Sequence, residues 1–165
     1  MGPVALTLDQ LKRLVDAQGV KYFVAPSEPT LLMNFGGRFG TYQVIMKVEV
    51  DGRFLQFRTM GYGLCPKSHP HCDALLQVLG ALDYELRMTK WGWDPRDGEI
   101  VACMDMWLED ATLTNQQFQF LLSSFLPAID LAHQRIGVAL ETGVDQGLHM
   151  PEPEPVPSGN GPMVV

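Results

Sequence analysis

Apolar residues recur along this chain with two different periods, and the period distinguishes helices from strands. Near the N-terminus, leucines spaced three or four positions apart predict an amphipathic helix, and Thr7 with Gln10 forms a capping box at its start. A second capping box, Thr114 with Gln117, opens a longer segment with one apolar face, which predicts the last helix. Pro127 lies inside this segment, and we expect it to bend the helix or to break it in two.

Alternating apolar and polar residues predict six strands arranged in hairpins. The predicted strands cover residues 20–25, 30–35, 41–50, 53–60, 87–93 and 99–110. The dipeptide Asp51-Gly52 is typical of a two-residue turn between the third and fourth strands, and tight turns of this kind join antiparallel neighbours. The register expected for the last hairpin sets Trp93 opposite Ile100 and turns Trp91 to the same core face.

The segment 72–86 is predicted to be a helix that is apolar over most of its circumference. Leu75, Leu79 and Leu82 form one stripe, and Leu76 widens the apolar surface beyond it. A helix of this kind is covered on more than one side. In a chain of 165 residues we expect the second cover to come from another subunit, which makes these four leucines the predicted interface of a homodimer.

The outward face of the last predicted strand mixes apolar and charged side chains. It carries Val101, Cys103, Asp105, Trp107 and Glu109. This mixture is too apolar for free solvent and too charged for a core, and exposed apolar patches often mark contacts with other proteins. We therefore predict that a protein or peptide partner contacts Met88, Val101, Cys103 and Trp107.

The element order α-β-β-β-β-α-β-β-α predicts one α+β domain, an antiparallel β-sheet with helices packed on it. We place this domain at residues 7–143, after a short N-terminal extension of residues 1–6. Residues 144–165 form an acidic tail whose last part, PEPEPVPSGNGPMVV, is rich in proline. Such a composition cannot build a core of its own, so we expect the tail to be disordered.

The overall charge narrows the classes of partner. The formal net charge is −7 and the twelve Lys and Arg residues are spread along the chain, with only Lys12 and Arg13 adjacent, so we expect no binding to nucleic acid. No apolar run approaches the length of a membrane-spanning helix, and we expect no membrane contact. The N-terminal sequence MGPVALTLDQ lacks the basic and apolar regions of a secretory signal, and three cysteines do not suggest a disulfide framework. We therefore expect a cytoplasmic protein.

Two cysteines and two histidines fall within eight positions of the stretch YGLCPKSHPHCDALLQ. They are Cys65, His69, His71 and Cys72, and they suggest a metal site, a redox site or a loop that enters the next helix. Structural zinc usually takes ligand pairs from separate rigid elements, whereas these four residues lie on one segment. We favour a loop in which Ser68 or His69 caps the helix, and we expect no metal or other cofactor. A metal- or redox-linked domain using the four residues remains the alternative, because a cysteine at a helix N-terminus, such as Cys72, can be reactive.

Other candidate motifs are weaker. GGRFG at residues 36–40 is rich in glycine but joins two predicted strands, whereas a phosphate-binding loop leads into a helix. Asp105, Glu109 and Asp110 cluster near a strand end, and we interpret them as a solvated rim because the sequence places no histidine or lysine partner beside them. The sequence contains no GxSxG, HExxH or P-loop signature, so we predict that the protein is not an enzyme.

The run RFLQFRTMGYGLCPKSHPHCDALLQVLGALDYELRMTKWGW, continued by GEIVACMDMWLEDATLTNQQFQFLLSSFLPAIDLAHQRI, resembles the YbjN-like family of bacterial proteins over about residues 7–140. The resemblance lies in a strand pair, a loop with proline, a helix carrying ALLQVLGAL, a hairpin, and LEDATLTNQQF before the last helix. That family is similar in fold to the type III secretion chaperones, small acidic homodimers that bind unfolded segments of secreted partners. The resemblance implies an α+β sandwich that acts as a non-enzymatic, chaperone-like or regulatory module.

Overall fold

The computed structural model of the chain describes residues 5–26, 28–109 and 111–148, and the other residues lie outside this description. The elements are, in order, α1 (Leu8–Ala17), β1 (Phe23–Val24), β2 (Thr30–Gly36), β3 (Thr41–Glu49), β4 (Phe54–Met60), β5 (Gly63–Leu64), α2 (Cys72–Glu85), β6 (Lys90–Trp93), β7 (Glu99–Trp107) and α3 (Asn115–Thr142). The predicted order is confirmed, with a two-residue strand, β5, added before α2. The first predicted strand, at residues 20–25, is reduced to the two residues of β1.

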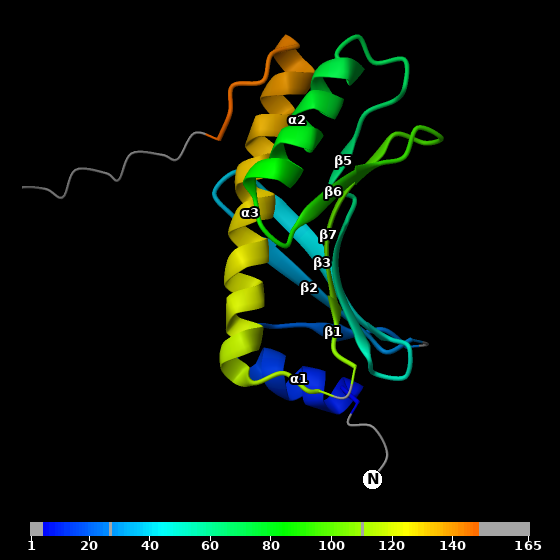
Figure 1. Ribbon diagram of the computed structural model, residues 1–165, viewed down its shortest axis with the longest axis vertical. Coiled ribbons are helices and arrows are strands. Elements are labelled where there is room, and N and C mark those ends of the chain that lie inside the picture. The colour runs from blue at the N-terminus through cyan, green and yellow to red at the C-terminus, as the bar shows by residue number, and fades with distance from the viewer. Residues whose placement is uncertain (1–4, 27, 110, 149–165) are drawn as a thin grey trace, which may run out of the picture.

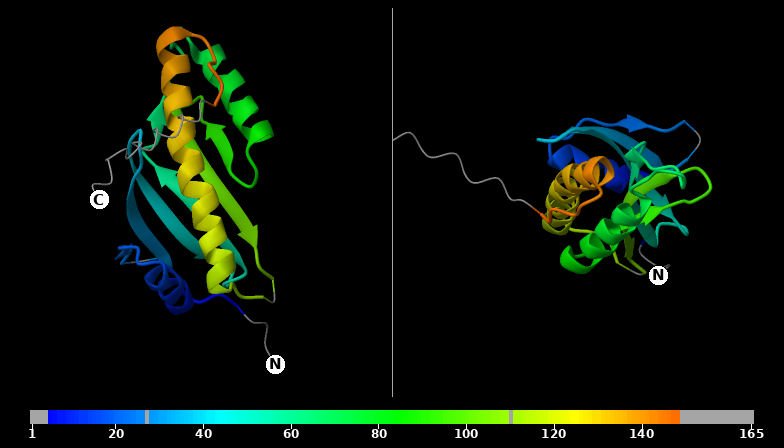
Figure 2. Two further views of the ribbon diagram at one scale, coloured as in Figure 1. Left: turned by 90° about the vertical axis from the view of Figure 1, so that its left-hand side faces the viewer. Right: turned by 90° about the horizontal axis from the view of Figure 1, so that it is seen from above.

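The strands form one antiparallel, seven-stranded sheet in the order β1-β2-β3-β4-β7-β5, and β6 pairs with β7. The α+β class is therefore confirmed. The three helices lie against one face of the curved sheet (Figure 1), and the described part of the chain places no helix on the other face, which we call the open face. α3 runs along the sheet, with α1 near one end of it and α2 beside the other (Figure 2). None of the described helices has the length and apolar character required to cross a bilayer.

The core lies between α3 and the central strands because alternate strand residues face the helices. On β3 these buried residues are Tyr42, Val44, Met46 and Val48. Phe57 of β4 packs edge-on against Phe118 and is tilted against Phe125, with ring centroids 5.9 Å apart in both pairs. Such aromatic pairs contribute roughly 0.5–1.5 kcal/mol each beyond the burial of their area. They hold α3 across the middle of the sheet.

The register of the last hairpin is as predicted. Trp93 pairs with Ile100 and Trp91 with Ala102, so both tryptophans lie on the helix-facing side. Trp91 and Ile100 are buried there, whereas Met106 further along β7 is only half-buried.

Of the two outcomes expected at Pro127, a bend or a break, the break does not occur. α3 continues from Asn115 to Thr142 as one helix with Pro127 inside it. A proline lacks the N–H that would bond the carbonyl four residues earlier, and its ring crowds that carbonyl, which here belongs to Ser123. Ser123 and Pro127 are both exposed, so water can bond that carbonyl and the helix remains intact.

The turn after β3 is longer than the two-residue turn predicted at Asp51-Gly52. It comprises the four residues 50–53, and the first three have positive φ angles of 52°, 55° and 86°. The carbonyl of Gly52 accepts the N–H of Leu6 at 2.9 Å, and a Cβ at Gly52 would lie 2.6 Å from the Leu6 carbonyl oxygen. The turn is therefore shaped to hold the segment that leads into α1.

Candidate partner-binding surface

Three of the four predicted partner-binding residues lie on the open face. Val101 and Cys103 are half-buried between neighbouring strands, and Trp107 at the end of β7 is 57% exposed. The Trp107 ring lies 6.0 Å from the Phe54 ring of β4, and its indole N–H donates to the Glu109 carboxylate. Burial raises the pKa of the Cys103 thiol, so this residue contributes apolar surface rather than a reactive thiolate.

The fourth predicted residue, Met88, lies on the other side of the sheet edge. It stands at the corner between α2 and β6 with a φ of 70°, which is rare for a residue with a side chain, and it is 57% exposed. Met88 lines an apolar hollow of about 230 Å³ on the helix side of β7. The other residues that line this hollow are Met106, Leu113, Gln117, Phe120, Leu121 and Ser124. The structure therefore separates Met88 from the other three residues.

The sequence reasoning missed Phe120. This residue of α3 is 62% exposed and lines the hollow together with Met88. Phe118 and Leu121 supply the buried face of α3 at this point, so the aromatic residue between them projects on the polar side. A large apolar residue on the polar side of an amphipathic helix was the available signal.

The charged residues of the open face are engaged with one another. Arg58 of β4 lies 3.3 Å from Glu99 of β7. Asp105 accepts a hydrogen bond from Gln56 at 2.7 Å and another from Lys90. These pairs neutralise the middle of the face and leave its apolar side chains as the prominent feature.

Asp105, one of the three carboxylates predicted to form a solvated rim near the end of β7, is instead half-buried and hydrogen-bonded. Burial alone would raise the pKa of Asp105, but the bonds from Lys90 and Gln56 hold it below its ordinary value. An ionised, paired carboxylate is a poor proton donor near neutral pH. Glu109 is bonded to a tryptophan, and Asp110 lies outside the described residues.

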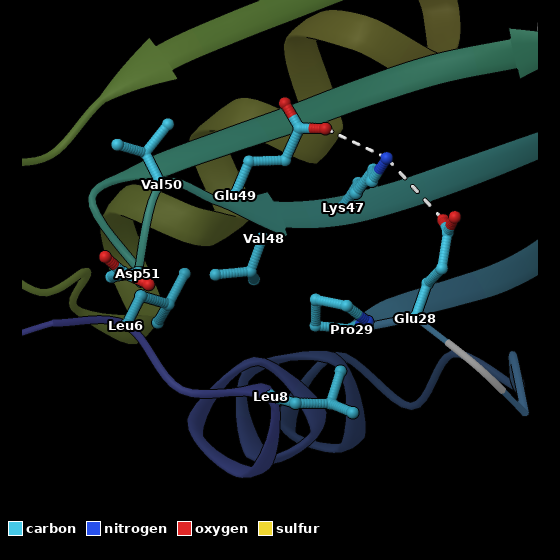
Figure 3. A pocket seen from close by; sticks show the side chains of 10 residues that line it. Leu6, Leu8, Glu28, Pro29, Lys47, Val48, Glu49, Val50 and Asp51 are labelled. Carbon is cyan, nitrogen blue, oxygen red and sulfur yellow. Dashed lines mark ion pairs between the residues drawn. The ribbon is translucent and has the colours of Figure 1, made fainter.

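A wider hollow of about 560 Å³ lies where α1 approaches the turn after β3 (Figure 3). Lys47 extends between Glu49 and Glu28, with N–O distances of 2.9 and 3.5 Å, while Leu8 and Val48 form apolar walls. Glu49 and then Glu28 raise the pKa of Lys47. Its amine is therefore protonated at neutral pH and cannot act there as a nucleophile or base. The arrangement ties β3 to the segment before β2.

α2 buries three of the four leucines that were expected at a dimer interface. Leu75 and Leu82 are fully buried and Leu79 is 6% exposed, because α2 packs against both α3 and β6 of the same chain. Leu76 is 44% exposed. The second cover of this helix thus comes from the chain itself, contrary to the expectation, and of the four leucines Leu76 alone is available to another subunit.

The Cys/His stretch is a loop that enters α2, but neither predicted residue caps the helix. The N-cap is His71, and no side chain bonds the first turn, so the cap expected from Ser68 or His69 is absent. The His71 N–H donates instead to His69 Nδ1 at 3.1 Å. His71 Nδ1 lies 2.7 Å from the Leu140 carbonyl, and because a carbonyl only accepts, Nδ1 carries the proton. The loop therefore fastens the start of α2 to the end of α3.

Cys65 fixes the other end of this loop to the last hairpin. It is fully buried; its N–H donates to the Gly98 carbonyl at 2.8 Å, and its own carbonyl accepts the Trp93 indole at 2.9 Å. Burial, and then the neighbouring Cys72, raise the pKa of Cys65 to about 11. Among the described residues no three His, Cys, Asp or Glu side chains are grouped to hold a metal ion. This arrangement gives no support to the metal-linked alternative. It does bring Cys65 and Cys72 together, as the redox-linked alternative requires, but the raised pKa keeps the Cys65 thiol protonated at neutral pH.

Asp130 on α3 fixes the GGRFG loop, which joins β2 to β3 as predicted. Its carboxylate accepts the N–H groups of Arg38 and Phe39 at 2.7 and 2.9 Å. It also accepts the buried Tyr42 hydroxyl at 2.7 Å. The close approach requires a glycine, since a Cβ at Gly37 would lie 2.2 Å from Asp130 Oδ1. This buried carboxylate is a structural fastening, and its saturated hydrogen bonding leaves it unsuited to proton transfer.

Arg135, also on α3, joins α2 to the chain that follows α3. Its side chain is 3% exposed, and the guanidinium donates to Glu85 at 2.6 and 3.2 Å and to Asp145 at 2.7 and 2.8 Å. Leu148 packs against the core, so ordered contacts continue past the predicted domain end. The rest of the predicted tail, residues 149–165, lies outside the described residues.

Comparison with known proteins gives a family and a fold. A family model for YbjN, described as "Putative bacterial sensory transduction regulator", matches residues 7–137. Comparison with curated proteins gives no match. A crystal structure of YbjN, "a putative transcription regulator from E. coli", is similar with a TM-score of 0.62 and 17% identity, covering 85% of this chain and 96% of that one. The HopA1-SchA chaperone-effector complex is similar with a TM-score of 0.53 and 12% identity, covering 75% and 90%. The predicted chaperone-like α+β fold is confirmed.

Proposed function

The chain belongs to the YbjN family, and from this premise we propose that it is a non-enzymatic protein-binding module, chaperone-like or regulatory, that works in the cytoplasm as a homodimer. The observation that carries the proposal is exposed apolar surface on both sides of the end of β7, with Trp107 on the open face and Met88 and Phe120 on the helix side, each more than half exposed. Exposed apolar groups concentrated in this way are typical of protein interaction sites. The similarity to a chaperone-effector complex supports a protein as the ligand.

The state of the ionisable groups supports binding rather than catalysis. Catalytic acids, bases and nucleophiles need accessible groups with a pKa near the working pH. In the described residues, Lys47 is protonated between two carboxylates, Asp105 is ionised and paired, and Cys65 is buried with a raised pKa. These groups hold the fold together.

The partner-binding role is tested by affinity capture from lysate of the native organism. We expect Trp107→Ser to lose most of the proteins that the wild-type chain captures, because the substitution removes the exposed indole of the open face. The matched control is Phe23→Ser, which removes an aromatic ring that is 68% exposed on β1 at the opposite edge. If the wild type and Trp107→Ser capture the same proteins, the open face is not the partner surface. If the wild type captures no protein, the protein-binding proposal is wrong.

The homodimer is proposed to form through the outer side of α2. Leu76 and Tyr84, 44% and 92% exposed, lie two turns apart, and the exposed Gly80 between them leaves open space, since a Cβ added there would meet no atom within 4 Å. Light scattering should report a dimer for the wild type and a monomer for Leu76→Lys, while Val144→Lys, at a position 59% exposed, stays dimeric. A monomeric wild type, or a dimeric Leu76→Lys, contradicts this contact.

A further inference from the structure

The last part of β7 is an edge of the sheet. β6 pairs with β7 only as far as Cys103, whose partner is Lys90. Before Lys90 the chain turns away from β7 at Met88, where φ is positive. Residues 104–107 therefore pair with β4 on one side, and among the described residues no strand pairs with them on the other (Figure 2, left).

The backbone of this edge directs hydrogen-bonding groups outward. In an antiparallel ladder, every second residue bonds the same neighbouring strand. The Asp94 N–H donates to the Glu99 carbonyl at 2.9 Å, which identifies Glu99 as a residue whose backbone faces the β6 side. Asp105 and Trp107 continue this series beyond the end of β6. Their N–H and carbonyl groups therefore face the side where β7 has no neighbouring strand.

Apolar surface borders the same edge on both faces of the sheet. On the helix side lies the hollow of about 230 Å³ that Met88, Met106 and Phe120 help to line. On the open face lies the exposed ring of Trp107. The side chains of a strand alternate between the two faces. A strand added at this edge would place one side chain in the hollow and the next beside the indole.

The charge around the edge indicates what kind of segment it fits. Residues 83–90 and 105–109, which border the edge, contain four carboxylates and two cations. Glu85 pairs with Arg135 and Asp105 with Lys90, so one carboxylate remains in excess at this border. Residues 113–124, which lead into α3 and form its first turns, contain no charged side chain. A second copy of this chain would bring the same acidic borders together, and like charges on paired strands are destabilising. A segment that carries Lys or Arg beside its apolar residues is complementary.

We propose that the edge formed by residues 104–107, together with the hollow rimmed by Met88 and Phe120, binds an extended segment of a partner protein by β-strand addition. The segment pairs with the backbone of Asp105 and Trp107, inserts an apolar side chain into the hollow, and carries Lys or Arg next to its apolar positions. This inference rests on the proposed protein-binding function and specifies its surface and its ligand.

The probe for this proposal is a phage-displayed library of random peptides of about nine residues, long enough for one strand. The wild-type protein should enrich peptides with apolar residues at alternate positions and a net positive charge. In fluorescence polarisation, Phe120→Ser should weaken binding of an enriched peptide about tenfold or more, while the control Phe23→Ser should change it less than about twofold. A peptide N-methylated at alternate amides should lose binding, because it cannot form the ladder.

Each opposite result overturns the proposal. These results are no enrichment, enrichment of acidic or non-alternating peptides, full binding of the N-methylated peptide, or equal binding by Phe120→Ser. Phe120 is exposed, so its replacement should leave the unfolding transition unchanged, and urea unfolding of the variant verifies this. If lysate capture succeeds and depends on Trp107 while the peptide tests fail, the edge is not the site but the protein-binding function stands. If lysate capture also fails, both are wrong.

Discussion

Replacing Asp130 by alanine should cost the fold several kilocalories per mole, because its carboxylate is the common acceptor for three donors. The side chain is 8% exposed and accepts two loop N–H groups and the Tyr42 hydroxyl at 2.7–2.9 Å. The two N–H groups lie in a part-exposed loop where water can replace the carboxylate, so we assign them about 1 kcal/mol each. The buried Tyr42 hydroxyl, left without a partner, costs about 1–3 kcal/mol. The expected loss is therefore about 3–5 kcal/mol.

Urea unfolding followed by tryptophan fluorescence measures this loss, with the wild type and Tyr42→Phe run beside Asp130→Ala. Tyr42→Phe removes one of the three bonds and should cost about 1–2 kcal/mol. In the double variant the two losses should not add, because both substitutions remove the same bond. A loss below about 1 kcal/mol for Asp130→Ala, or full additivity, would contradict the account of Asp130 as the fastening of the GGRFG loop.

The pH dependence provides a second measure of the same interaction. Burial acts to raise the pKa of Asp130, but hydrogen bonds from Tyr42, Phe39 and Arg38 outweigh it and hold the pKa below its ordinary value. A carboxyl with a depressed native pKa stabilises the fold fully above its unfolded pKa, near 3.9, and this stabilisation is lost as pH falls through the native value. The difference in unfolding free energy between the wild type and Asp130→Asn should therefore be constant around neutral pH and shrink in acid. A difference that grows in acid would reverse the assigned sign.

Three further predictions concern other parts of the fold. Arg135→Ala should lower the unfolding free energy, measured by urea titration, by about 3–5 kcal/mol, because it leaves the carboxylates of Glu85 and Asp145 without their buried cation. A loss below about 1 kcal/mol would mean that both carboxylates are already solvated. Gly98→Ala should lower the melting temperature measured by circular dichroism, because Gly98 has a φ of 83° and a Cβ would lie 2.6 Å from the Cys65 carbonyl oxygen; an unchanged melting temperature contradicts this. With a pKa of about 11 raised by burial, Cys65 should resist a thiol reagent at mildly alkaline pH until urea is added, as peptide mass spectrometry can show; rapid labelling of the native protein would contradict its burial.

Local rules of the sequence predicted most of the fold. The capping boxes at Thr7 and Thr114 are formed as expected, because each depends on a residue only three positions away. The register that pairs Trp93 with Ile100 follows from a short turn in the same way. The break considered at Pro127 does not occur, because a proline interrupts a helix less readily where the carbonyl that it leaves unpaired, here that of Ser123, faces solvent.

The parts that the sequence did not predict depend on contacts between distant segments. Apolar periodicity indicates that α2 is covered on several sides, but it cannot say whether the cover comes from this chain or another, and here β6 and α3 bury Leu75. Asp130 and Arg38, whose backbone N–H it accepts, are 92 residues apart in the sequence, so this contact could not be inferred from spacing. Phe120 and Met88 border one hollow only because α3 packs beside the corner after α2.

The place of β7 in the sheet affects how the chain folds as it leaves the ribosome. β4 pairs with β7 through partners such as Gln56 and Asp105, which are 49 residues apart, and the intervening chain contains α2 and β6. A nascent chain therefore displays β4 with one side unpaired until β7 has been made, and Leu55 and Phe57 without their helical cover until α3 has been made. Long-range pairing of this kind slows folding and lengthens exposure to aggregation. A chain that stops before β7 would expose an incomplete sheet, with an unpaired edge and an uncovered apolar face, to the cell's chaperones and proteases.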